Sequence, residues 1–206
     1  MMVSMTDQQV APGTPVQELA RIGGHRCLDF VNTLVAADEP VMRDSLPTPE
    51  AYRRWAERAG IAVDRAEDAK RDAAALRRAK ALRRAIREIA TAVAAAKPAP
   101  ADAAALLTAE TARSFRSRAL APTPKGLGWR RSRQDLDSVT DQLAVEATAL
   151  FADARELRLK RCIGAHCGWF FLDLSRNGSR RWCSMQDCGN RAKARRHRAR
   201  ARDAAA

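Results

Sequence analysis

The most informative stretch of the chain, residues 161–202, reads RCIGAHCGWFFLDLSRNGSRRWCSMQDCGNRAKARRHRARAR. It holds four of the five cysteines in two pairs, each spaced C-x4-C, with fifteen residues between the pairs. Zinc prefers four tetrahedral thiolate or imidazole ligands, usually supplied as two short-spaced pairs that the fold brings together. The spacing therefore predicts one structural zinc ion held by Cys162, Cys167, Cys183 and Cys188.

The cysteines and the two nearby histidines have alternative roles besides zinc binding. Two disulfides are an alternative, but nothing in the sequence marks a secreted chain, and cytosolic thiols stay reduced. His166 lies inside the first pair and is interpreted as a bystander. His197 follows Cys188 by more than two helical turns, which is too far for one compact site. The fifth cysteine, Cys27, is interpreted as a buried core residue.

The residues around the cysteine pairs predict a hairpin and a helix. Trp169 to Leu172 is apolar enough for a strand, and Asn177-Gly178 is a hairpin turn signal, after which residues 180–182 lead into the second cysteine pair. Residues 191–202 are rich in Ala and Arg and lack Pro and Gly, so we expect a helix there. The order is that of a treble-clef-like finger. A unit this small buries little apolar surface, so the metal would supply much of its folding free energy.

Most of the excess positive charge lies on the same segment. The chain has 37 Lys/Arg and 24 Asp/Glu, and residues 155–202 hold fourteen of the former and three of the latter. Such an element favours polyanions through phosphate neutralisation and counterion release, although a solvated basic tail is the alternative. We expect DNA as partner, with RNA as the second possibility. The candidate contacts are Arg180, Arg181, Asn190, Arg191, Lys193, Arg195, Arg196, Arg198 and Arg200. For Asn190, capping of the helix is the competing role.

Residues 183–191, CSMQDCGNR, with RRW before them and AKARRHR after them, resemble the CGNR zinc finger, a C-terminal module of bacterial proteins proposed to be transcription regulators. The four cysteines match the metal positions of that family. The linking hairpin matches at Gly168, Trp169, Phe171, Asp173, Ser175, Arg180 and Arg181. In that family the finger follows a ligand-sensing ABATE domain, whose opening motif resembles residues 24–34, GHRCLDFVNTL. The resemblance implies a zinc-dependent, DNA-binding transcription regulator that senses a small ligand.

The predicted fold class is mainly α: a helical N-terminal domain with a small β-hairpin, followed by the treble-clef-like zinc finger. Residues 1–16 are polar and are expected to be disordered or loosely docked, 17–158 to form the ABATE-like sensor domain, and 159–203 the finger with its basic helix. The predicted helices cover 27–35, 48–60, 64–96, 102–111 and 134–157, and a strand–turn–strand lies between 115 and 132. Thr48, Asp64 and Asp102 are the expected helix caps.

Three features of the N-terminal domain leave alternatives open. Asp29, Asn32 and Thr33 lie among apolar residues and either face a ligand or brace the core. The arginines between 77 and 87 either lie on a solvated face or contact DNA. The apolar stripe of the helix 134–157 either faces the core or forms a dimer seam. Because this helix leads directly into Cys162, a rearrangement of the N-terminal domain would move the finger.

Several classes of function are disfavoured. No run of eighteen apolar residues and no signal peptide are present, so we expect a cytoplasmic protein without a membrane partner. The chain lacks a phosphate-binding Gly-rich loop, a metalloprotease histidine pair and a Gly-x-Ser-x-Gly elbow, so we expect no enzyme. A thiol redox switch, in which oxidation expels zinc, is a further alternative. A palindromic DNA target would imply a homodimer.

Overall fold

The computed structural model describes residues 10–12, 21–38, 41–64, 68–131, 133–152, 157–165 and 167–203. Its helices are α1 (Arg26–Val31), α2 (Pro49–Arg58), α3 (Ala69–Ala94), α4 (Ala101–Arg116), α5 (Leu136–Ala152) and α6 (Asn190–Asp203), with a π-helical turn, η4 (Met185–Gly189). Its strands are β1 (Val10–Pro12), β2 (Leu34–Asp38), β3 (Val41–Asp44), β4 (Arg118–Thr123), β5 (Gly126–Arg131), β6 (Leu159–Arg161) and β7 (Phe170–Leu172). The predicted mainly α class is confirmed.

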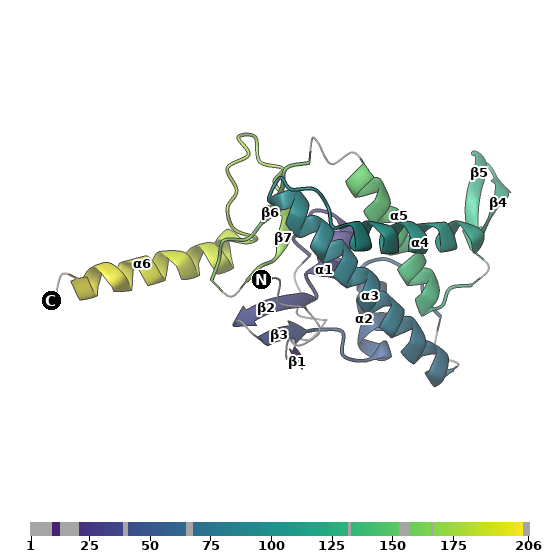
Figure 1. Cartoon of the computed structure of the whole chain (residues 1–206), viewed down its shortest axis with the longest axis horizontal. Helices are drawn as coiled ribbons and strands as arrows, with labels where there is room; N and C mark the ends of the chain where they lie inside the picture. The colour runs from purple at the N-terminus through teal and green to yellow at the C-terminus, as the bar shows by residue number, and fades with distance from the viewer. Residues whose placement is uncertain are drawn as a thin grey trace.

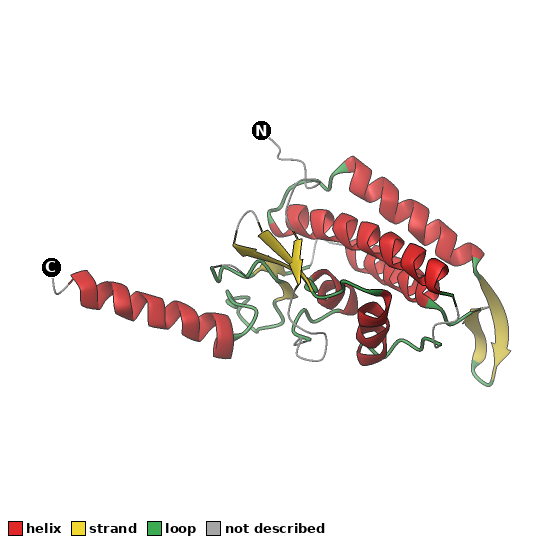
Figure 2. Ribbon diagram, turned by 90° about the horizontal axis from the view of Figure 1, so that it is seen from below, coloured by secondary structure: helices red, strands yellow, loops and turns green. Residues whose placement is uncertain are grey.

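The molecule is elongated, with two elements that project from a helical body. Figures 1 and 2 show α6 extending from one end and the β4–β5 hairpin from the other. Strand β3 lies between β1 and β2, whereas β4–β5 and β6–β7 are separate two-stranded sheets. None of the helices in the described ranges has the length and apolar character needed to cross a bilayer.

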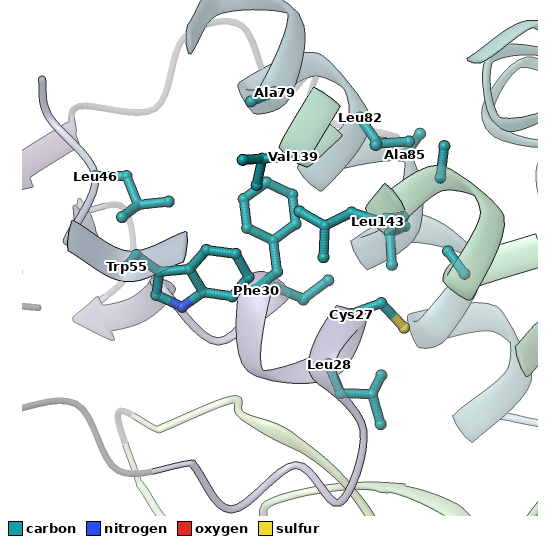
Figure 3. Packing of buried hydrophobic residues seen from close by; sticks show 14 of the residues in the cluster. Cys27, Leu28, Phe30, Leu46, Trp55, Ala79, Leu82, Ala85, Val139 and Leu143 are labelled. Carbon is teal, nitrogen blue, oxygen red and sulfur yellow. The ribbon is translucent and has the colours of Figure 1, made fainter. Parts of the chain in front are cut away.

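The hydrophobic core forms where the short helix α1 meets α2, α3 and α5. Phe30 of α1 lies 5.1 Å from Trp55 and 5.9 Å from Tyr52 between ring centroids. Figure 3 shows Phe30 among Leu82, Val139 and Leu143 from the surrounding helices. The predicted apolar stripe of α5 packs into this core, since Leu136, Val139, Leu143 and Ala147 are fully buried. The core-facing interpretation is confirmed, and this stripe is not available as a dimer seam.

The predicted helix starts are correct for α2 and wrong for α3 and α4. Thr48 accepts a hydrogen bond from the Ala51 N–H at the start of α2, and Pro49 occupies its first turn. Helix α3 is capped by Asp68 rather than Asp64, because the Asp68 carboxylate accepts from two backbone N–H groups. Helix α4 starts after Pro100 without a side-chain cap, so Asp102 lies inside its first turn.

The helix predicted over 27–35 ends at Val31, because the polar residues that follow bond elsewhere. The Thr33 hydroxyl donates to the Phe30 carbonyl at 2.6 Å, and the chain then continues as β2, antiparallel to β3. Strand β1 pairs with β3 in parallel, so Val10–Pro12 are docked on the sheet, which agrees with the second of the two states expected for residues 1–16. The rest of 1–16 lies outside the described residues.

Two of the arginines expected on a solvated face of α3 are buried, and a third is nearly so. Arg83 donates to Asp44 at 2.8 Å and to the Thr33 hydroxyl at 2.7 Å, while Arg87 donates to the Leu34 carbonyl at 3.0 Å. Arg78 pairs with Glu110, Asp137 and Asp141 on the neighbouring helices. The solvated-face interpretation is therefore wrong for these three residues. Arg77 and Arg84 are exposed, as both interpretations require.

The predicted strand–turn–strand is confirmed as the hairpin β4–β5. Six residue pairs run from Arg118↔Arg131 to Thr123↔Gly126 in antiparallel register. Its first strand begins at Arg118 rather than Phe115, because α4 continues to Arg116.

Candidate metal centre and nucleic-acid interface

The four predicted zinc ligands lie together at one point of the fold. Their sulfur atoms all lie within 4.8 Å of one another, and all four residues are buried. Two of the sulfur–sulfur separations are 3.5 Å, between Cys167 and Cys183, and 3.6 Å, between Cys183 and Cys188. A tetrahedral zinc ion with Zn–S bonds of about 2.3 Å places its sulfurs about 3.8 Å apart. The cluster therefore fits one structural zinc ion, and the cysteines are free thiols rather than disulfides.

The first cysteine pair approaches the second so closely that a side chain at position 164 would be crowded. A Cβ atom on Gly164 would lie 3.0 Å from the Cys188 sulfur and 3.3 Å from the Cys162 sulfur. Backbone N–H groups complete the sulfur environment, since those of Gly164 and Cys183 donate to Cys162 at 3.4 and 3.3 Å. The turn at Gly164, which we call the knuckle, thus leaves room for the sulfurs. This role of the glycine could have been predicted from the sequence CIGAHC.

The charge balance of the cluster favours a cation. Hydrogen bonds from Cys167 and Cys183 lower the pKa of Cys162, whereas hydrogen bonds to Cys162 and Cys167 raise the pKa of Cys183. The thiols therefore cannot all ionise without a compensating positive charge, which a zinc ion supplies when bound. Arg191 lies at the rim, and its guanidinium donates to the Cys188 sulfur at 3.1 Å. The bond to Cys188 in turn raises the pKa of Arg191.

The hairpin of the finger differs from the predicted one. Strand β7 pairs with β6, which precedes the first cysteine pair, with Leu159 opposite Leu172. Residues 180–182 form no strand, and Asn177-Gly178 closes a loop instead, with Gly178 at φ 58°. This prediction was wrong because three residues before the knuckle gave no strand signal long enough to recognise. Trp169 and Trp182 pack against the sulfur cluster.

The loop after β7 is held by an ion pair that sequence reasoning did not find. The Lys160 ammonium donates to Asp173 at 2.6 Å and to the Gly178 and Arg180 carbonyls. Hydrogen bonds from Lys160 and Ser175 hold the pKa of Asp173 well below its usual range. No short-range pattern in the sequence links Lys160 to Asp173, because they meet only through the pairing of β6 with β7.

The finger is joined to the helical domain through α1 and the residues beside it. The Asn32 side chain donates to the Phe170 carbonyl and accepts from the Phe170 N–H, both at 2.8 Å. The Leu172 N–H donates to the Gly23 carbonyl at 2.8 Å. Arg87 from α3 lies 5.4 Å from the centre of the Phe170 ring. Strand β7 is therefore held at one end by Asn32 of the motif at 24–34 and at the other end by Gly23, which directly precedes that motif.

The three candidate ligand-binding residues are occupied by these internal contacts. Asp29 accepts from the Gly23 N–H at 2.8 Å. Asn32 is bonded to Phe170, and Thr33 lies between the Phe30 carbonyl and Arg83. The structure therefore shows the bracing contacts of the alternative interpretation, and a ligand-binding role for these residues stays an untested prediction.

Helix α6 carries most of the predicted nucleic-acid contacts. It follows η4, which contains Cys188, and it has no buried residue. Within the described ranges, no side chain forms an ion pair with its cations. Besides Arg191, the predicted cationic contacts on this helix are Lys193, Arg195, Arg196, Arg198 and Arg200, which are exposed on all sides of it. His197 lies on the same helix, outside the metal cluster, and His166 lies outside the described residues.

The remaining candidate contacts divide into exposed and engaged residues. Arg181 is exposed and lies 5.3 Å from the centre of the Trp182 ring. Arg180 points inward, since it donates to the Ile22, Trp182 and Cys183 carbonyls and lies 4.2 Å from the centre of the Phe171 ring. The phosphate-binding role predicted for Arg180 is therefore wrong. Asn190 donates to the Gln186 carbonyl, and Ser184 instead caps the turn, so the capping role predicted for Asn190 is also wrong.

Two family models match the chain in consecutive segments. Residues 24–158 match the ABATE family, whose description reads "Putative stress-induced transcription regulator", and residues 158–201 match the CGNR zinc finger. A comparison with curated protein sequences gave no match. The matched order is the one that the residues at 24–34 and 183–191 indicate. The chain therefore belongs to the ABATE family and carries a CGNR zinc finger after the ABATE domain.

Proposed function

We propose that this protein is a zinc-dependent, DNA-binding transcription regulator and that α6 is its main DNA-contacting element. The observation that carries the proposal is the exposure of α6: the helix leaves the metal cluster with no buried residue, and in the described structure none of its cations forms an ion pair with a carboxylate. Free cations on a projecting helix fit the phosphate backbone, which dominates affinity for DNA. The family description supports the same role.

Zinc would be held by Cys162, Cys167, Cys183 and Cys188, and its chemistry would be structural. When bound, it links the knuckle to η4 and so supplies folding free energy to a unit with a small core. Cys188 lies in η4, two residues before α6 begins. The cluster therefore fixes where the helix starts and in which direction it projects.

The cations of α6 are distributed around the helix, which divides their expected roles. Contacts to phosphates position a protein on DNA, whereas contacts to base edges specify the sequence. Arginine binds guanine through two hydrogen bonds, the commonest specific contact in the major groove. We propose that one face of α6 reads base edges while the flanking arginines, with Arg181, contact phosphates.

For ligand sensing, we propose a site in an apolar cavity of the helical domain. It has a volume of about 490 Å³ and is lined by parts of α3, α4 and α5, among them Ile89, Leu107, Thr111 and Phe151. Small-molecule sites are typically about 300–1,000 Å³ and mostly apolar. Helix α3, which contributes Ile89, also packs against β6 of the finger. A ligand in this cavity would act on the finger through α3.

The proposal includes no catalytic activity and a cytoplasmic location, where the thiols stay reduced. A zinc ion with four cysteine ligands has no open position for a water molecule. RNA binding and a thiol redox switch compete with the proposal and are distinguished by experiment.

The test is a fluorescence-anisotropy titration of zinc-loaded protein with duplex DNA and structured RNA pools at several salt concentrations. We expect tight duplex binding with a steep salt dependence, lost in Cys183→Ser/Cys188→Ser and in Arg195→Glu/Arg196→Glu. Arg77→Glu/Arg84→Glu on the exposed face of α3 is the matched charge control. Preference for the RNA pool, or equal binding by wild type and the cysteine variant, would contradict the proposal. Loss of zinc and of binding under mild peroxide would support the redox alternative.

A further inference from the structure

The β4–β5 hairpin exposes an apolar face that the helical domain does not cover. Leu120 pairs with Trp129 and Pro122 with Leu127, so these four side chains lie on one face of the two-stranded ribbon. Leu120 is 54% exposed, Trp129 55% and Leu127 69%. The hairpin projects from the body at the end opposite α6 (Figures 1 and 2).

This arrangement is not explained by the stability of the hairpin. An isolated two-stranded hairpin is marginally stable in water, and exposed apolar patches on such elements mark interaction sites. Its attachment to the body rests on few contacts: Phe115 of α4 packs against Trp129 at 5.6 Å between ring centroids, while Arg118 lies 5.9 Å from the Phe115 ring and donates to the Asp141 carbonyl at 3.3 Å. The apolar face is therefore available to a partner.

The charge of the hairpin identifies the kind of partner. Residues 113–133 contain seven Lys/Arg and no Asp/Glu, although residues 1–154 as a whole are nearly balanced. Arg116, Lys125 and Arg130 are exposed, and within the described ranges no ion pair or hydrogen bond engages their side chains. This charge opposes pairing of two copies through this face and favours a polyanion.

The shape of the ribbon favours a groove over a flat surface. Its two strands are joined by the two-residue loop Pro124-Lys125, so its tip is narrow, and Gly126 at φ 117° closes the turn. Pro122 lacks an N–H group, which disfavours pairing of β4 with a strand from another protein. Proteins that enter the minor groove combine such cations with apolar wedges, including leucine and proline, inserted between base steps.

We propose that the β4–β5 hairpin is a second DNA-binding element, an arm that enters the minor groove of duplex DNA. Lys125 and Arg130 contact phosphates, while Leu127 and Trp129 lie against the sugars and the base edges. This inference rests on the proposed function only in that both take duplex DNA as the ligand. Because α6 and the arm lie at opposite ends of the molecule, together they require a longer or bent duplex.

The test uses the full-length, zinc-loaded protein and a fluorescein-labelled 40-base-pair duplex at four salt concentrations. One variant, Lys125→Glu/Arg130→Glu, removes two cations of the arm, and another, Leu127→Ser/Trp129→Ser, removes its apolar tip. Arg77→Glu/Arg84→Glu on α3 is the control with the same change in net charge. These side chains are exposed, and unchanged zinc content and circular dichroism will confirm folding.

Two results are expected if the arm binds DNA. The charge variant lowers the slope of log affinity against log salt by about 1.8, because two phosphate contacts each contribute about 0.9. The apolar variant weakens binding at least about fivefold without changing the slope, as loss of aromatic contact with bases does. The α3 control changes neither quantity beyond the effect of net charge. Quenching of tryptophan fluorescence by DNA is reduced in Trp129→Phe.

The arm and α6 can fail separately. If both arm variants behave like the α3 control while Arg195→Glu/Arg196→Glu abolishes binding, the arm proposal is overturned and the function proposed for α6 stands. If only the arm variants lose binding, the arm proposal stands and the role of α6 falls. No duplex binding by wild type at low salt overturns both. The arm proposal also falls if the apolar variant retains DNA affinity but loses binding to phosphatidylglycerol vesicles or self-association in sedimentation.

Discussion

Replacing Asn32 with alanine tests whether the helical domain and the finger are held together by one side chain. Asn32 is 3% exposed and makes both of its hydrogen bonds to Phe170 at 2.8 Å. Asn32→Ala leaves the N–H and the C=O of Phe170 without these partners. Each buried, unsatisfied group costs about 1–3 kcal/mol, so we expect a loss of about 3 kcal/mol in unfolding free energy, with water relieving part of the upper limit.

Two measurements separate this role from a general loss of stability. Urea denaturation gives the free energy of unfolding, and transfer of zinc to a chromophoric chelator reports on the finger. We expect Asn32→Ala to accelerate zinc transfer, because β7 lies directly after the first cysteine pair. Tyr52→Phe is the matched control, since it removes a buried hydroxyl that is 3.0 Å from Thr140, inside the helical core. It is expected to lower stability by about 1 kcal/mol and to leave zinc transfer unchanged.

A near-isosteric variant separates the loss of hydrogen bonds from the cost of the cavity that alanine leaves at position 32. Asn32→Asp keeps the acceptor for the Phe170 N–H but sets a carboxylate against the Phe170 carbonyl. We expect it to be at least as destabilising at pH 7 as Asn32→Ala, although it leaves no empty space. A loss below about 0.5 kcal/mol in both variants, within the range of ordinary surface substitutions, would refute the reasoning. So would zinc transfer no faster than in Tyr52→Phe.

Three further substitutions test individual contacts. Arg191→Gln removes the donor to Cys188, and we expect about tenfold weaker zinc binding in chelator competition, since outer-shell partners typically contribute that much; unchanged affinity would show that the contact is incidental. Arg180→Gln is expected to lower the melting temperature without changing the salt slope of DNA binding, and a lower slope would restore its role as a phosphate contact. Burial alone would raise the pKa of Asp44, but the hydrogen bond and charge of Arg83 outweigh it and lower this pKa. Ionised Asp44 therefore stabilises the fold above about pH 4 and loses this contribution as the pH falls further, so Asp44→Asn is expected to flatten the acid limb of the stability profile in urea titrations.

The elements that could be predicted from sequence are those with local causes. The cap at Thr48 and the stripe of α5 depend on residues within one or two turns, and both are correct in the structure. The four cysteines were predictable because zinc chemistry restricts ligand type and spacing. The strand β6 and the buried position of Arg83 were not predictable, since each depends on a partner far away in the sequence.

The sequence correctly indicated that most of the excess positive charge lies on the finger, but the basic character of the hairpin was overlooked. Counting residues 1–154 together gave a nearly neutral domain and concealed the seven cations at 113–133. The exposed side of that hairpin could have been found from the alternation of Leu120 and Pro122 with small residues. The roles of Arg180 and Asn32 could not, because a polar side chain near a site has the same sequence signal whether it points outward or inward.

Strand β7 shows why the two parts of the chain act as one structure. Successive residues of a strand face opposite sides, and here the two sides are two different cores. Phe170 belongs to the core of the helical domain, and Phe171 belongs to the cluster around the cysteines. Any movement of α1 that shifts the Phe170 backbone through Asn32 therefore also shifts Phe171 against the metal ligands. The motif at 24–34 thus holds the finger in place, and through β7 it contributes to the position from which α6 projects.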